Sequence, residues 1–301
     1  MRLRILCSAL LAMLPGSLFA EGLDPYILAG IDQGTRQEVQ TRVEERLTAE
    51  GFEILGSYSP AGDENLGVIC VTNEHLKASA VQSGGLHGFA AVLRVGLIKT
   101  DSGIEVSYTN PLYWGNAYYR KEFPQVEEVY ILLDQRFRTA LADLSDSRFE
   151  AFGSRKGMTP AKLRKYHYMI TMPYFHDVVV LDKGSSYGEA VARIESRAAA
   201  KGSEVKIVYS IKFPEQEMAL FGTALTGENG ETKFLPKIDF KDPRHIPFLP
   251  YEMLVLKDKV VSLHGKYRIA LSFPDLSMGT FMKIVSTPGD IANAQRTVAS
   301  K

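Results

Sequence analysis

Apolar side chains recur every fourth residue in two segments of the chain, a spacing typical of a helix with one buried face. In the first segment this stripe consists of Val39, Val43 and Leu47. Thr35 and Glu38 precede it with the spacing of a capping box, and Gly51 follows it, where a helix commonly ends in a left-handed residue. We therefore expect an amphipathic helix between Thr35 and Gly51, flanked by strands at 26–31 and 52–58.

The same pattern returns 151 residues later. Its capping box is Ser186 and Glu189, its stop is Gly202, and its stripe consists of Tyr187, Val191, Ile194 and Ala198. Eight of the 18 residues in 42–59 are identical to their partners in 193–210. Agreement at one constant offset is what an internal duplication produces, so we expect two copies of one unit.

Apolar runs between these helices predict the strands. They fall at 66–72, 88–98 and 104–109 in the first half, and at 178–181, 217–225, 253–256, 260–263 and 267–272 in the second. A further amphipathic helix spans 129–144, and its counterpart begins at Thr287. Each half then has the order β-α-β4-α. The predicted class is α+β, with two tandem domains and helices on one face of a mostly antiparallel sheet.

The predicted boundaries follow from this order. We expect a first domain over 21–146, a glycine- and base-rich linker over 147–165 and a second domain over 166–301. The second domain carries a long loop, 226–250, with four prolines that prevent strand pairing: Pro236, Pro243, Pro247 and Pro250. Long loops inside compact domains often carry function.

A run closed by a proline also occurs twice, at Val106–Arg120 and Ile269–Lys283. In each copy a strand-like run meets a proline, Pro111 or Pro274, and a turn with a glycine, an aromatic residue and a base follow. The offset between these copies is 163, so the second half holds 12 extra residues, which we place in the loop 226–250.

The first twenty residues have the pattern of a secretory signal peptide. Arg2 and Arg4 precede the apolar run Ile5–Leu14, and Ala20 is a small residue suited to cleavage. This run is about half of the ~20 residues that a membrane-spanning helix needs. We expect cleavage after Ala20, no transmembrane segment thereafter and a periplasmic location.

Charge and cysteine content narrow the possible partners. Without the signal peptide, 33 basic residues face 35 acidic ones, a net charge of −2. A near-neutral chain has no electrostatic basis for binding nucleic acid or an anionic membrane surface. Cys70 is then the single remaining cysteine and lies in an apolar run, so we expect a buried thiol and no intramolecular disulfide.

Three segments of the first half resemble a bacterial family catalogued as domain of unknown function 302. They are Gly51-Phe52-Glu53, the run 68–73 and Tyr108-Thr109-Asn110-Pro111. The second copy, with the run 268–275, looks like a more diverged member. The resemblance covers nearly the whole mature chain and implies the β-α-β4-α topology. It implies no established activity and supplies no catalytic residues.

The richest candidate site is the aromatic end of the first proline-closed run. Its candidate residues are Asn110, Tyr113, Trp114, Asn116 and Tyr119. Aromatic side chains with a polar group suit a binding surface, because each covers a large area with few rotatable bonds. We therefore expect a small molecule or a protein partner to bind here. The alternative is that the rings only pack against the sheet.

Arg244 and His245 in the long loop are expected to complete this binding surface, and they could also act as an acid/base pair. The chain contains no His-Glu-x-x-His or phosphate-loop motif. The sequence thus favours a binding protein without a cofactor over an enzyme. An enzyme with an unrecognised site remains an alternative.

A second alternative is a copper-handling protein. Its ligands would be His167, Met169, Met172 and His176, because imidazole and thioether groups suit copper and an exported protein can meet that metal. In an extended chain Met172 would point away from the other ligands, so such a site needs a bend, which Pro173 could supply. The competing interpretation is that these side chains are structural.

Overall fold

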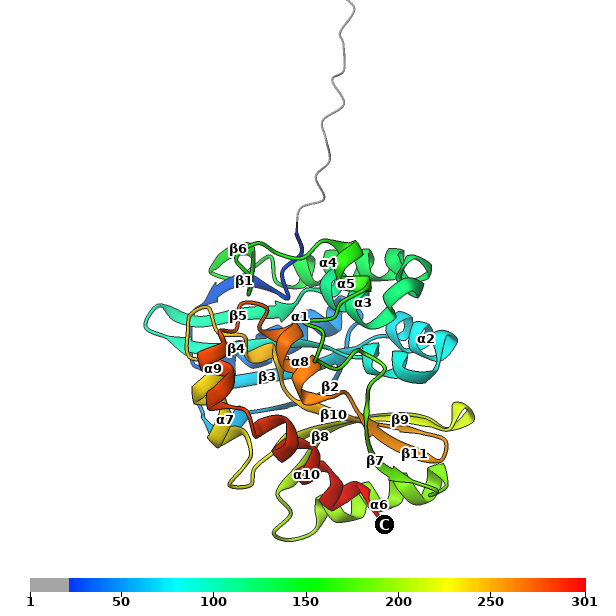
Figure 1. Cartoon of the computed structure of the whole chain (residues 1–301). Helices are drawn as coiled ribbons and strands as arrows, with labels where there is room; N and C mark the ends of the chain where they lie inside the picture. The colour runs from blue at the N-terminus through cyan, green and yellow to red at the C-terminus, as the bar shows by residue number, and fades with distance from the viewer. Residues whose placement is uncertain (1–21) are drawn as a thin grey trace, which may run out of the picture.

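The computed structural model describes residues 22–301, which fold into two antiparallel β-sheets with helices packed against them (Figure 1). The α+β class predicted from the sequence is confirmed. The predicted signal peptide lies outside the described residues. Cys70 is buried, as expected, and burial raises the pKa of its thiol to about 12.

The first half builds a six-stranded sheet with the order β2-β3-β4-β5-β1-β6. Its strands are β1 (Tyr26–Asp32), β2 (Glu53–Tyr58), β3 (Leu66–Thr72), β4 (Leu93–Thr100), β5 (Gly103–Thr109) and β6 (Asp146–Phe152). Its helices are α1 (Arg36–Ala49), α2 (Glu74–Ser83), α3 (Pro111–Tyr119) and α4 (Glu127–Ala140), with the short 3₁₀ turns η1 (Pro60–Gly62), η2 (Gly85–Ala90) and η3 (Arg120–Gln125). Helices α1 and α4 cover one face of this sheet.

The second half builds a five-stranded sheet with the order β7-β11-β10-β9-β8. Its strands are β7 (Val179–Lys183), β8 (Val205–Phe213), β9 (Met218–Leu225), β10 (Tyr251–Leu256) and β11 (Lys259–Ser262). Its helical segments are α5 (Pro160–Arg164), α6 (Tyr187–Ala199), η4 (Pro214–Gln216), α7 (Glu231–Ile238), η5 (Ile246–Phe248), α8 (Gly265–Ser272), α9 (Met278–Lys283) and α10 (Thr287–Ala299). Helices α6 and α10 pack on one face of the sheet.

Apart from β6, the two sheets have the same strand order. If the strands of each half are numbered from its own first strand, both sheets read 2-3-4-5-1. The helix after the first strand also begins in the same way in both. Thr35 and Ser186 each accept a hydrogen bond from the amide of the third helical residue, and Glu38 and Glu189 accept one from the cap amide. Both capping boxes predicted from the sequence are therefore confirmed.

The second proline-closed run is not a strand, which corrects the sequence prediction. Residues 265–272 form α8, and Pro274 follows a helix end, where proline is common. The strand in the place of β5 is β11, and His264 caps α8 as Asn110 caps α3. These caps lie 154 residues apart, so Val106–Arg120 does not correspond to Ile269–Lys283.

The predicted linker and the predicted long loop both contain regular structure. In the segment 147–165, β6 pairs with β1 (Tyr26 opposite Phe152), and α5 packs against α3. In 226–250, α7 and η5 form although prolines exclude strands there. Pro236 lies inside α7, where it removes one helical hydrogen bond. Helix α2 was not predicted, and α3 forms where a turn was expected after Pro111. The strand expected over 88–98 begins only at Leu93, because residues 85–90 form η2.

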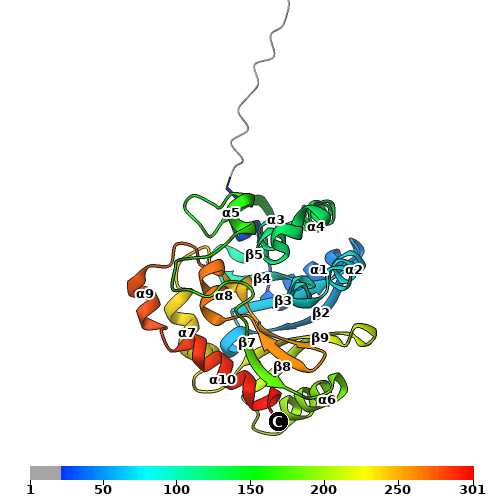
Figure 2. The ribbon, with the colours of Figure 1, turned by 45° about the vertical axis from the view of Figure 1, so that its right-hand side comes forward.

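The two sheets meet at their edge strands β2 and β8, and helices α4 and α6 lie at opposite ends of the molecule (Figure 2). Each sheet also contacts a 3₁₀ turn of the other half: η5 lies on β3, β4 and β5, and η2 lies on β9 and β10. Glycine permits both contacts. A Cβ atom on Gly96 would lie 2.5 Å from Ile246 Cγ2, and one on Gly88 would lie 2.8 Å from Leu254 Cδ1.

Candidate functional site

A cluster of charged side chains is buried where the halves meet. Arg94 of β4 forms an ion pair with Glu252 of β10, and Arg268 Nη2 of α8 lies 3.7 Å from Glu252 Oε2. The hydroxyl of Tyr209 donates a hydrogen bond of 2.6 Å to Glu252 Oε1. The guanidinium group of Arg268 also lies 4.8 Å from the ring centre of Trp114, within range of a cation–π interaction. This cluster ties the two sheets together.

The aromatic segment predicted to be a binding surface lies beside this cluster. Its five candidate residues are at most 5% exposed: Asn110, Tyr113, Trp114, Asn116 and Tyr119. The hydroxyl of Tyr113 donates to the carbonyl oxygen of Leu271 (2.8 Å), and the indole N–H of Trp114 donates to that of Pro25 (2.8 Å). The structure thus supports the packing alternative for this segment.

Helices α3 and α8 exchange hydrogen bonds in a reciprocal manner. Tyr113 of α3 donates to Leu271 of α8, and Tyr267 of α8 donates to the carbonyl oxygen of Ala117 of α3 at 3.3 Å. The donors are 154 residues apart, as are the acceptors and the two helix caps. Reciprocal contacts of this kind are typical of an interface with two-fold symmetry.

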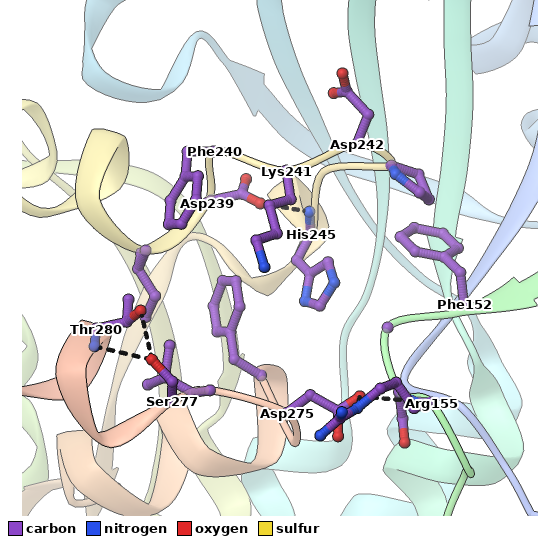
Figure 3. A pocket seen from close by; sticks show the side chains of 16 residues that line it. Phe152, Arg155, Asp239, Phe240, Lys241, Asp242, His245, Asp275, Ser277 and Thr280 are labelled. Carbon is purple, nitrogen blue, oxygen red and sulfur yellow. Dashed lines mark hydrogen bonds and ion pairs between the residues drawn. The ribbon is translucent and has the colours of Figure 1, made fainter.

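A cleft of about 550 Å³ opens beside this interface (Figure 3). Residues of three segments that are far apart in the sequence line it: 152–155 at the end of β6, 238–245 at the end of α7, and 273–280 from the end of α8 into α9. Its aromatic wall consists of Phe152, Phe240 and Phe273. The first segment leads out of the first half, and the other two belong to the second half.

Asp239 contributes a buried carboxyl group to this cleft. Its Oδ1 accepts a hydrogen bond of 2.7 Å from the amide of His245, and its Oδ2 lies 3.5 Å from Arg244 Nε. Burial raises the pKa of Asp239 to about 7, and the hydrogen bond and Arg244 oppose this shift. Helix α7 fixes this group, because Glu231 at its other end accepts hydrogen bonds from Tyr58 and Ala61 of the first half.

His245 lines the same cleft with a neutral imidazole. Its Nδ1 lies 2.9 Å from the carbonyl oxygen of Ser272, which can only accept, so Nδ1 carries the proton. Nε2 is then the acceptor of the ring. The ring stacks on Phe273, with 4.7 Å between the ring centres, and also contacts Tyr26. Burial lowers the pKa of His245 to about 4.

A second cleft, of about 850 Å³, adjoins the first and shares Ser154, Arg155 and Asp275 with it. Its basic lining residues are Arg155, Lys156, Lys162, Lys165 and His167. Asp275 is the single acidic residue that lines it, and the backbone amide of Arg155 donates to this carboxylate at 2.5 Å. The second cleft therefore carries an excess of positive charge.

The predicted copper ligands are arranged differently from the sequence expectation. His167 Nε2 lies 2.7 Å from the carbonyl oxygen of Met172, and the ring of Tyr174 stacks on both His167 and His176. Met169 and Met172 line a third hollow that neither histidine lines. Among residues 22–301, no group of three or more His, Cys, Asp or Glu side chains is placed to hold a metal ion. Copper binding stays a prediction.

Of the residues that line the clefts, the sequence singled out His245 and, as a copper ligand, His167, and it missed most of the others. Arg244 lies next to Asp239 but lines neither cleft. The basic run that supplies Arg155, Lys162 and Lys165 is visible in the sequence but was interpreted as a linker. Asp239 gives no sequence signal, because its burial depends on α7 and on contacts with the first half. Asp275 lies in the second proline-closed run, which was expected to be a turn after a strand.

No family model and no curated protein matches this sequence. Among solved structures, the chain is similar to an uncharacterized conserved protein, DUF302, from Bacillus stearothermophilus. The identity is 16% and the TM-score 0.34, and the match covers 39% of this chain and 95% of the other. A likeness at this level assigns neither a family nor a function. None of the helices in residues 22–301 combines the length and apolar character that crossing a bilayer requires.

Proposed function

We propose that this protein is an exported, periplasmic binding protein that holds a small anion with a flat apolar part in the two adjoining clefts. The signal-peptide pattern of Met1–Ala20 supports export. Finding Glu21 as the first residue of the natural protein would support this part of the proposal, and an intact N-terminus would contradict it.

We also propose that the two halves are tandem copies of one domain similar to domain of unknown function 302. Their equal strand order and the constant offset of 154 residues between α3 and α8 support duplication. In this view the α3–α8 interface derives from a symmetric contact between two identical domains. The clefts lie beside this interface, at segments where the copies differ.

The binding proposal rests on a difference between the two clefts: the second is lined by basic side chains and the first by an aromatic wall. The second cleft offers four lysine and arginine side chains, which attract an anion before contact and pair with it afterwards. The first cleft offers an aromatic wall and the neutral ring of His245, which can accept a hydrogen bond. One ligand can contact both clefts, because Ser154, Arg155 and Asp275 line both.

Calorimetric titration with phenyl phosphate tests this proposal, because this molecule joins a dianion to a flat ring. We expect binding at about 20 mM salt that weakens at about 300 mM, since salt screens exposed charges. The double variant Lys162→Glu/Lys165→Glu should lose binding. Lys201→Glu/Lys206→Glu carries the same charge change at exposed positions outside both clefts and should bind normally.

Two results would contradict the proposal. One is the absence of heat at low salt together with a folded protein by circular dichroism. The other is an equal loss of binding in both double variants, which would show a general effect of net charge.

A further inference from the structure

A third hollow, of about 40 Å³, brings together three methionine side chains from two separate segments. Met169 and Met172 are the first and last residues of a turn, in which the amide of Met172 donates to the carbonyl oxygen of Met169 at 2.9 Å. Met278 is the first residue of α9. The remaining lining residues are Tyr168, Lys266, Ile269, Ala270, Phe273, Leu276 and Phe281.

Two of these methionines lie at the surface: Met169 is 44% exposed and Met278 is 58% exposed. Met172 is partly buried and packs against the core. Residues 22–301 contain seven methionines, of which three line this one hollow. Methionine fills irregular gaps inside proteins, but a gap in the core does not explain the two exposed side chains.

The chemistry of the hollow selects one class of ligand. Thioether sulfur is a soft, uncharged donor that suits Cu(I) and the similar ion Ag(I). No carboxylate or imidazole lines the hollow, so zinc and other borderline or hard divalent ions lack the donors they prefer. Lys266 is the single charged lining residue, and its positive charge further disfavours a doubly charged ion.

We propose that Met169, Met172 and Met278 form a three-sulfur site for a soft monovalent metal ion, Cu(I) or Ag(I). This site differs from the histidine–methionine set expected from the sequence, because it excludes His167 and His176 and adds a residue of α9. The hollow, of about 40 Å³, has room for a single metal ion. The proposal does not depend on anion binding in the adjoining clefts.

Titration of the mature chain with Ag(I), followed by NMR of ¹³C-labelled methionine methyl groups, tests the site. We expect the methyl signals of Met169, Met172 and Met278 to shift together and to saturate at one equivalent. Met282 also lies on α9 and is 59% exposed, but it does not line the hollow, so its signal should not move.

Competition with a coloured Cu(I) chelator under reducing conditions gives the affinity. Replacing Met169 or Met278 by leucine keeps the apolar volume and removes the sulfur, and each change should weaken binding by at least about tenfold. Met282→Leu and the double variant His167→Gln/His176→Gln should bind like the parent protein. Thermal unfolding confirms that each variant is folded.

Three outcomes would overturn the proposal: no shift at one equivalent of Ag(I), undiminished Cu(I) affinity in Met169→Leu/Met278→Leu, or a loss that appears only in the histidine variant. In the second case the hollow would serve only as an apolar surface, for which leucine is an adequate substitute.

Discussion

Glu252 lies between two guanidinium groups in the interior, and its single charge faces both Arg94 and Arg268. Buried ion pairs are expensive to form, because each charge loses its hydration. They are still more expensive to break, because the remaining charge has no partner. Loss of this one carboxylate would leave two buried cations in mutual repulsion.

Glu252→Ala should therefore lower the free energy of unfolding by about 3–5 kcal/mol, measured by urea denaturation. Glu53→Ala is a suitable control, because it removes a carboxylate that pairs with Lys77 at the surface. An exposed pair contributes about 0–1 kcal/mol. Equal losses in the two variants would show that the buried cluster does not hold the halves together.

The raised pKa of Asp239 leads to a second prediction for a single residue. Its pKa is raised from 3.8 to about 7 in the folded protein, so between these values the folded state binds more protons than the unfolded state. Stability from this group is fully present below about pH 4 and is lost as the pH rises toward 7. In Asp239→Asn the amide oxygen can still accept from the His245 amide, and this pH-dependent loss should disappear.

The stability of Asp239→Asn relative to the parent protein should accordingly rise between pH 4 and 7, by up to about 4 kcal/mol. Urea denaturation at several pH values measures the difference. Glu231 and His245 titrate in both proteins, so their contributions cancel. A difference that stays constant with pH would contradict the assigned burial of Asp239.

At the scale of elements, the reciprocal bonds between α3 and α8 predict equal effects from equivalent changes. Tyr113→Phe and Tyr267→Phe each remove one buried hydrogen bond and should each cost about 1 kcal/mol of unfolding free energy. Tyr168→Phe, at an exposed ring, should cost nothing measurable. A large loss in only one of the two variants would argue against equivalent roles for the two helices.

The contact of η5 with β4 requires glycine at position 96. A Cβ atom there would lie 2.5 Å from Ile246 and 2.8 Å from Pro247, so Gly96→Ala should destabilise the protein by about 1–3 kcal/mol. Gly188→Ala is the matched control: in α6 nothing lies within 4 Å of the added atom, and stability should stay equal or rise by up to about 1 kcal/mol. If Gly96→Ala left the free energy of unfolding unchanged, η5 would not be packed against β4.

The sequence predicted those elements whose signals are local. Helices α1 and α6 were identified because capping boxes and apolar stripes act within one segment. Helix α8 was taken for a strand, because it is buried on all sides and its apolar residues show no helical period. Helix α7 was missed because Pro236 and the prolines that follow it were read as loop signals, although α7 forms with Pro236 inside it.

At the scale of the whole molecule, the candidate site exists only through the meeting of the two halves. The clefts are lined by the segment after β6, the end of α7 and the α8–α9 connection, which are brought together by the buried cluster and by Glu231. The basic run that supplies Arg155, Lys162 and Lys165 is visible in the sequence, but no local pattern shows that it lies beside the other two segments. The aromatic segment predicted to be a binding surface is buried in the interface between the halves.

The most direct test of the central claim is an NMR map of backbone amides during titration with phenyl phosphate. We predict saturable shifts confined to residues 152–168, 238–245 and 273–280, the segments that line the two clefts. Shifts that centre on other surfaces, or no shifts at millimolar ligand and low salt, would contradict the assignment of the clefts as the binding site.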